Sequence, residues 1–163
     1  MFLQYFKIKR NNYKNQTLSI YQEIVDHSNH FIKNSLNDKN YNFDEVFEIF
    51  SIITVFYLKK LKDTNTQSNN EISQKVIDKF IRDLDQNFRE KGIGDMSIGK
   101  YVKKYVKKFY YRLRILDLIL KENSNFNFDV YIRKFGISNH GNIKKINEDL
   151  KTLYNDIVID KQK

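Results

Sequence analysis

The sequence predicts an all-α protein: a single-domain bundle of about five to six helices around a central hydrophobic helix. The chain has 163 residues with no proline and only five glycines, whereas sandwiches, barrels and β-meanders need such turn residues repeatedly. Hydrophobic residues make up 40% of the chain, and 13 Phe and 11 Tyr contribute to them. A chain of this size and composition can bury a real core, which argues against disorder. Apolar residues also recur at helical spacing over long segments.

This spacing predicts six helices. They span about residues 18–33, 44–62, 71–91, 97–121, 128–135 and 143–159. The helix at 44–62 is apolar all round, which is typical of a helix at the centre of a bundle, and Glu48 interrupts it. Asp44 is its expected N-cap. The polar stretch 63–70 is expected to be a surface linker, and Gly92 to be the residue that ends the third helix.

Residues 1–17 are expected to form a basic N-terminal segment ahead of one helical domain, residues 18–163. The segment mixes Phe2, Leu3 and other apolar residues with cations, and it is too short and too polar for a secretory signal. Two interpretations stay open. The segment is a weak interfacial membrane anchor, or a frayed tail partly docked on the bundle, which is the favoured interpretation.

The formal net charge of +9 is concentrated in two segments that contain no acid, residues 1–22 and 96–116. Such sorting favours an anionic partner, which could be RNA, lipid headgroups or an acidic protein surface. An AT-rich coding bias accounts for abundant Lys and Asn, but less readily for their sorting into two patches.

The helix at 97–121 has one apolar side and one basic side at 100° per residue. Arg112 borders the apolar side. A merely solvated face is the alternative interpretation, but such a face usually intersperses acids, because like charges one turn apart repel. The residues predicted to bind a partner are Lys100, Lys103, Lys104, Lys107 and Arg114.

Nothing in the sequence points to an enzyme or to a bound cofactor. The chain has no Cys. Residues 94–100 fit the spacing of a phosphate-binding loop, but an amphipathic helix precedes them in place of a strand, and Tyr101 stands where that loop needs a Ser or Thr to hold magnesium. His27 and His30 lie one turn apart beside Asp26, yet a zinc site normally needs further convergent ligands.

Residues 92–100 are better explained as a tight connection between two antiparallel helices. Gly92 and Gly94 allow backbone angles that other residues resist, and Asp95 or Ser97 is the expected cap of the helix that follows. Gly99 falls inside the first turn, where glycine costs about 0.5–1 kcal/mol relative to alanine. Close approach to a neighbouring backbone or to a partner would explain that cost.

Asp83 and Arg112 each lie at the edge of an apolar helix face. We expect them to pair across the groove between their helices, as a structural ion pair and not a catalytic one.

Several stretches match one known family. They are Ile20–Val25, Phe43–Phe50, Asp83–Asp95, Ile98–Lys103 and Phe109–Arg112. Together they resemble the ubiquinol–cytochrome c chaperone family over roughly residues 18–137, as a bacterial-type member. The positions that match or support the family motif are Asp83, Gly92, Gly94, Asp95, Gly99, Lys100, Lys103, Phe109, Tyr110 and Arg112. Of these, Phe109 and Tyr110 are expected to be core residues.

The resemblance implies an all-α assembly factor for the cytochrome b subunit of respiratory complex III. Its client would be newly made cytochrome b, met near the ribosomal exit and the inner membrane, and a small partner protein would assist. The implied location is the cytoplasm, at the inner face of the membrane, or the matrix side in a eukaryote. Two rival functions stay open: an RNA- or ribosome-binding module, and a peripheral protein that binds anionic lipids.

Overall fold

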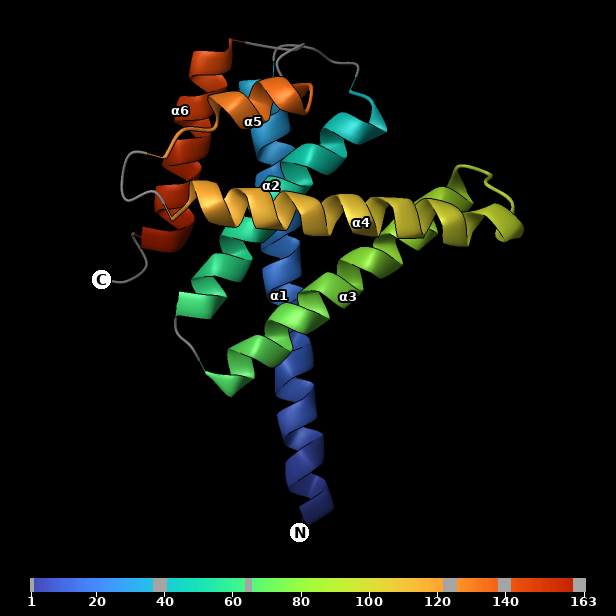
Figure 1. Cartoon of the computed structure of the whole chain (residues 1–163). Helices are drawn as coiled ribbons and strands as arrows, with labels where there is room; N and C mark the ends of the chain where they lie inside the picture. Colours follow the sequence, from blue (N-terminus) through green and yellow to red (C-terminus); the bar gives the residue numbers. More distant parts are fainter. Residues whose placement is uncertain (1, 37–40, 64–65, 122–125, 138–141, 160–163) are drawn as a thin grey trace. The chain divides into compact units, whose positions relative to one another are not determined.

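The computed structural model describes residues 2–36, 41–63, 66–121, 126–137 and 142–159, with side chains from Tyr13 onward. Its helices, in chain order, are α1 (Phe2–Ser35), α2 (Phe43–Asp63), α3 (Gln67–Glu90), α4 (Asp95–Ile119), α5 (Asp129–Lys134), α6 (Ile143–Tyr154) and the π-helical η2 (Asn155–Ile159) (Figure 1). These described segments contain no strand, which confirms the all-α helical bundle. None of their helices is long and apolar enough to cross a bilayer.

The chain divides into two compact units. Unit 1 comprises residues 1–23 and 61–111, and unit 2 comprises residues 24–60 and 112–163. Helices α1 and α4 each contribute to both. The separate segment 1–17 and the single domain 18–163 stay predictions.

Helix α1 begins far earlier than the expected start near residue 18. Its contact face continues through aromatic residues, because Lys75 Nζ lies 4.9 Å from the centre of the Tyr13 ring and Lys79 Nζ lies 5.0 Å from that of Tyr21. The sequence prediction relied on the spacing of aliphatic residues, and it therefore placed the start of α1 too late. The interfacial-anchor interpretation concerns side chains that lie outside the described residues.

The core of unit 1 forms along α3, as its amphipathic pattern predicted. Phe80 packs edge-on against Phe109 with ring centres 5.1 Å apart, and Phe88 packs against Tyr105 at 5.3 Å. The buried residues of α3 are Ile72, Val76, Ile77, Phe80, Leu84 and Phe88.

Local hydrogen bonds fix both ends of α3. Thr66 caps its start by accepting from the Asn69 amide at 3.2 Å, so the expected linker is shorter than residues 63–70. At its end Gly92 has φ +75°, its amide donates to the Arg89 carbonyl at 2.9 Å, and the Ile93 amide donates to the Phe88 carbonyl at 3.1 Å. This is a Schellman motif, which confirms the role predicted for Gly92.

Helix α2 is capped by Asn42, and the prediction of Asp44 was wrong. Asn42 Oδ1 accepts from the Glu45 amide at 3.0 Å, while the Asn42 amide donates to Glu45 Oε2 at 2.9 Å. This reciprocal pair is a capping box, which places Asp44 inside the first turn. Farther along α2, every residue from 51 to 57 is buried, which confirms it as the central hydrophobic helix.

The start of α4 also differs from expectation. The Gly94 carbonyl accepts from the amides of Ser97 at 2.8 Å and Ile98 at 3.2 Å, so Gly94 holds the cap position predicted for Asp95 or Ser97. Asp95 lies in the first turn, where its carboxylate accepts from Arg89 Nη1 at 2.7 Å.

Replacing Gly92 or Gly99 by alanine is expected to change the free energy of unfolding in opposite directions. A Cβ at Gly99 would meet no described atom within 4 Å, so close approach to a described neighbouring backbone does not explain this glycine. We expect Gly99→Ala to raise the free energy of unfolding by about 0.5–1 kcal/mol. Gly92→Ala should lower it by about 1–2 kcal/mol, because of the positive φ. Denaturant titration measures both, and effects of the same sign would contradict the expectation.

The core of unit 2 contains a cluster of aromatic residues among aliphatic ones. Phe56 of α2 lies 5.1 Å from Tyr154 and 5.9 Å from Phe128, ring centre to ring centre. Buried Asn147 accepts from the Phe128 amide at 2.8 Å, which joins the start of α5 to α6. The predicted last helix is confirmed as α6, with its final turn in the π-helical form.

Candidate functional site: the basic face of α4

The side chains predicted to bind a partner are all exposed on α4. Lys100, Lys103, Lys104 and Lys107 lie in unit 1, and Arg114 lies farther along the same helix. The opposite side of α4 is buried through Ile98, Tyr105, Phe109, Arg112, Leu116 and Leu120. Tyr105 belongs to this buried side although the apolar pattern had not included it.

The cations of this face have no acidic partner within the described part of the chain. None of the five basic residues forms an ion pair there. Each lysine has another three or four positions away, one helical turn along α4. A like-charge pair at this spacing costs a helix about 0.2–0.5 kcal/mol. The helix therefore carries a repulsion that an anionic partner would relieve.

Exposed apolar side chains lie among these cations. Tyr110 is 46% exposed, so its predicted core position is wrong, whereas Phe109 at 1% is confirmed as core. Met96, Tyr111 and Leu118 are exposed as well, and at 100° per residue all four project on the basic side. Sequence analysis missed this mixture, although the same angular arithmetic could have found it. Tyr, Met and Arg are the residues in which protein interfaces are enriched.

Behind this face, Arg112 anchors α4 within unit 2. Its Nε and Nη2 donate to the two carboxylate oxygens of Glu48 at 2.8 and 2.7 Å. The Tyr131 hydroxyl donates to Glu48 Oε2 at 3.1 Å, and the Phe135 ring centre lies 3.6 Å from the guanidinium carbon. All three charged or polar members are buried, so this cluster holds the helix in place and is closed to a ligand.

The predicted Asp83–Arg112 pair was therefore wrong. Asp83 pairs instead with Lys79, one turn earlier on α3. The signal that could have corrected the prediction was Glu48, a lone carboxylate in a helix that is apolar all round. Such a group must find a buried cation, and Arg112 stands at the border of an apolar stripe.

Two buried tyrosines hold their protons more tightly than usual. Burial raises the pKa of Tyr131 well above its ordinary value, and the Glu48 charge raises it further. Burial likewise raises the pKa of Tyr21, with a contribution from its hydrogen bond to Asp83. Tyr131 therefore stays a hydrogen-bond donor to Glu48 throughout the physiological pH range.

The remaining candidates form no catalytic constellation. The glycine-rich stretch at 94–99 is a turn followed by the start of α4, with α3 before it in place of a strand. His27 Nδ1 lies 2.9 Å from the Tyr57 hydroxyl, and His30 Nε2 lies 2.8 Å from Asn34 Nδ2. The described residues contain no group of three or more His, Cys, Asp or Glu side chains that could hold a metal.

Fold and site together define a class: an all-α protein whose prominent exposed feature is the basic face of α4. A family model described as "Ubiquinol-cytochrome C chaperone" matches residues 38–133, which is more than half of the chain. The protein therefore belongs to the ubiquinol–cytochrome c chaperone family, as the resemblance had indicated. No curated protein and no solved structure matches it. Membership implies a chaperone role toward complex III, and the family is not a known enzyme family.

Proposed function

We propose that this protein is an assembly chaperone for the cytochrome b subunit of complex III. We further propose that it binds its client or a small partner protein through the basic face of α4. The observation that carries the proposal is that face. Its exposed cations lack acidic partners among the described residues, they are interleaved with exposed Tyr and Met, and they lie inside the matched family segment.

The proposed place of action is the cytoplasm, at the inner face of the membrane and near the ribosomal exit, where newly made cytochrome b would be met. The mixed character of the face supports a protein over RNA as the partner. Exposed Leu118 and Met96 offer apolar contact area that a phosphate backbone does not use.

Crosslinking in native cells tests this proposal. The tagged chain is crosslinked, purified and analysed by mass spectrometry, with an unrelated tagged protein of similar charge as the control. Recovery of cytochrome b above that control is the expected result. Recovery of RNA or lipid without cytochrome b would overturn it and favour the rival functions.

A further inference from the structure

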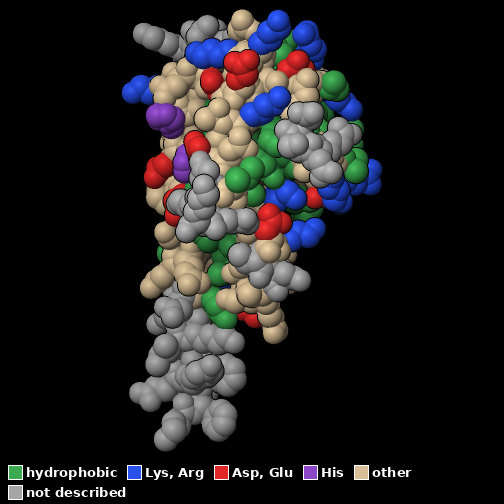
Figure 2. Space-filling model, turned by 90° about the vertical axis from the view of Figure 1, so that its left-hand side faces the viewer, with side chains coloured by type: hydrophobic (Ala, Val, Ile, Leu, Met, Phe, Trp, Pro, Cys, Tyr) green, Lys and Arg blue, Asp and Glu red, His purple; other side chains and the backbone are tan. Residues whose placement is uncertain are grey.

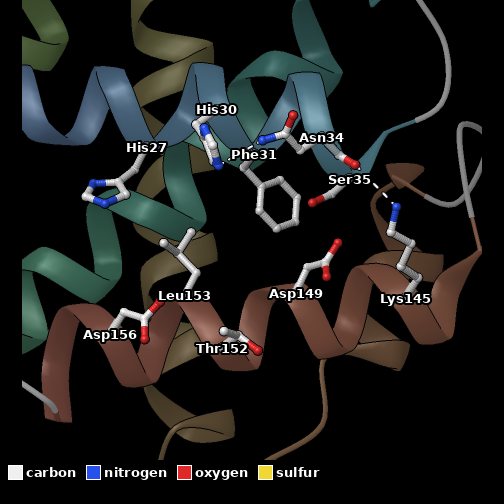
Figure 3. A pocket seen from close by; sticks show the side chains of 10 residues that line it. All are labelled: His27, His30, Phe31, Asn34, Ser35, Lys145, Asp149, Thr152, Leu153 and Asp156. Atoms are coloured by element: carbon white, nitrogen blue, oxygen red, sulfur yellow. Dashed lines mark hydrogen bonds between the residues drawn. The ribbon is translucent and has the colours of Figure 1, made fainter.

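A groove of about 310 Å³ lies in unit 2, between the second half of α1 and the C-terminal helical segment formed by α6 and η2 (Figure 3). Both walls lie outside the matched family segment, residues 38–133. Its lining residues are His27, His30, Phe31, Asn34, Ser35, Lys145, Asp149, Thr152, Leu153 and Asp156. On the face shown in Figure 2, histidine side chains lie beside carboxylates.

Two carboxylates in this groove have no partner among the residues that the structure describes. Asp149 and Asp156 form neither an ion pair nor a side-chain hydrogen bond with any residue that the structure describes. No residue that the structure describes neutralises their negative charge.

Ser35 supplies a second, independent observation. It is only 5% exposed, and its hydroxyl has no hydrogen-bond partner among the described residues. Figure 3 shows this hydroxyl pointing into the groove on the side of Asp149. The oxygen of this hydroxyl can accept a hydrogen bond from a ligand in the groove.

Several other polar groups of the groove have partners. Asn34 Nδ2 lies 2.8 Å from His30 Nε2, and His27 Nδ1 lies 2.9 Å from the Tyr57 hydroxyl. Lys145 Nζ donates to the Asn34 carbonyl at 3.3 Å, at one end of the groove. The lining groups that have neither an ion pair nor a side-chain hydrogen bond to a described residue are thus the carboxylates of Asp149 and Asp156 and the hydroxyls of Ser35 and Thr152. All four can accept a hydrogen bond from a donor cation.

Phe31 and Leu153 add apolar surface beside these acceptors. An apolar wall next to carboxylates suits a long aliphatic stem with a cationic tip, as in Lys and Arg. We propose that this groove binds a Lys or Arg side chain in a basic segment of a partner protein. The basic face of α4 would repel such a segment, so the two surfaces select partners of opposite charge. The inference goes beyond the proposed function and does not depend on it.

A direct titration tests the proposal. The probe is a fluorescein-labelled, N-acetylated Lys-Leu-Lys-Leu-Lys peptide, titrated with the full chain and followed by fluorescence anisotropy. Asp149→Asn combined with Asp156→Asn should weaken binding about tenfold, since both charge-assisted contacts are lost. The matched control combines Glu71→Gln with Glu148→Gln, which removes the same charge from exposed positions and should bind as the wild type does.

A second measurement uses the wild-type chain alone, so it does not depend on how the variants fold. Backbone amide chemical shifts should change on addition of the peptide at residues 27–35 and 145–156. Shifts confined to other segments, or equal binding by the Asp149/Asp156 variant and the wild type, would overturn the proposal. So would equal binding of a Glu-Leu-Glu-Leu-Glu peptide. Tighter binding of spermidine than of the Lys peptide would overturn the assignment to a protein segment.

Discussion

Arg112→Met should lower the free energy of unfolding by about 3–5 kcal/mol, the usual cost of breaking a buried ion pair from one side. The Glu48 carboxylate, which loses both guanidinium hydrogen bonds, would stay buried with the Tyr131 hydroxyl as its remaining hydrogen-bond partner among the described side chains. Domains of this kind are stable by about 5–15 kcal/mol, so a large part of the stability would be lost. Denaturant titration followed by circular dichroism measures the change.

Two further variants separate the cost of leaving Glu48 without its cation from the cost of changing side-chain packing. Lys121→Met removes an exposed ion pair with Asp117 on the same helix and should cost less than about 1 kcal/mol. A triple replacement, Glu48→Met with Arg112→Met and Tyr131→Phe, removes every polar member of the cluster and should regain most of the loss. If Arg112→Met cost as little as Lys121→Met, the cluster would not anchor α4 as inferred.

Replacing Lys103, Lys104 and Lys107 by Glu should abolish association with the partner while the fold stays intact. The change moves the formal charge of this helix side by six units, and like charge across an interface costs several kcal/mol. All three side chains are exposed, so thermal unfolding and circular dichroism should stay close to those of the wild type. The readout is the amount of cytochrome b recovered by crosslinking.

The matched control reverses Lys33, Lys62 and Lys144, which are also exposed but lie off the basic face. It changes the net charge equally, so it should retain the client if the position of the charge matters. Equal loss of client in both triple variants would point to net charge alone. Unfolding of the Lys103/Lys104/Lys107 variant would mean that these lysines are structural.

The fold class, the buried centre of α2, the amphipathic faces of α3 and α4, and the family could all be predicted from the sequence. Each of these follows from spacing along one helix or from a contiguous motif, because a helical period of 3.6 residues converts sequence position directly into a face. The Schellman end of α3 was predictable for the same reason, since Gly92 acts through its own backbone angle. The N-cap of α2 was harder to predict. Asn42 holds the cap position expected for Asp44, because it forms two reciprocal hydrogen bonds with Glu45.

Tertiary structure alone decided which residues far apart in the chain meet. Glu48 pairs with Arg112, which lies 64 positions away in the sequence. Asp83, which was expected to pair with Arg112, forms its ion pair with Lys79, one turn earlier on the same helix. The groove with Ser35 and Asp149 likewise has walls from opposite ends of the chain. Periodicity assigns each side chain to a face but says nothing about which helix packs against that face. The choice of partner depends on burial and on the distance between charges, and both are set only when the helices pack.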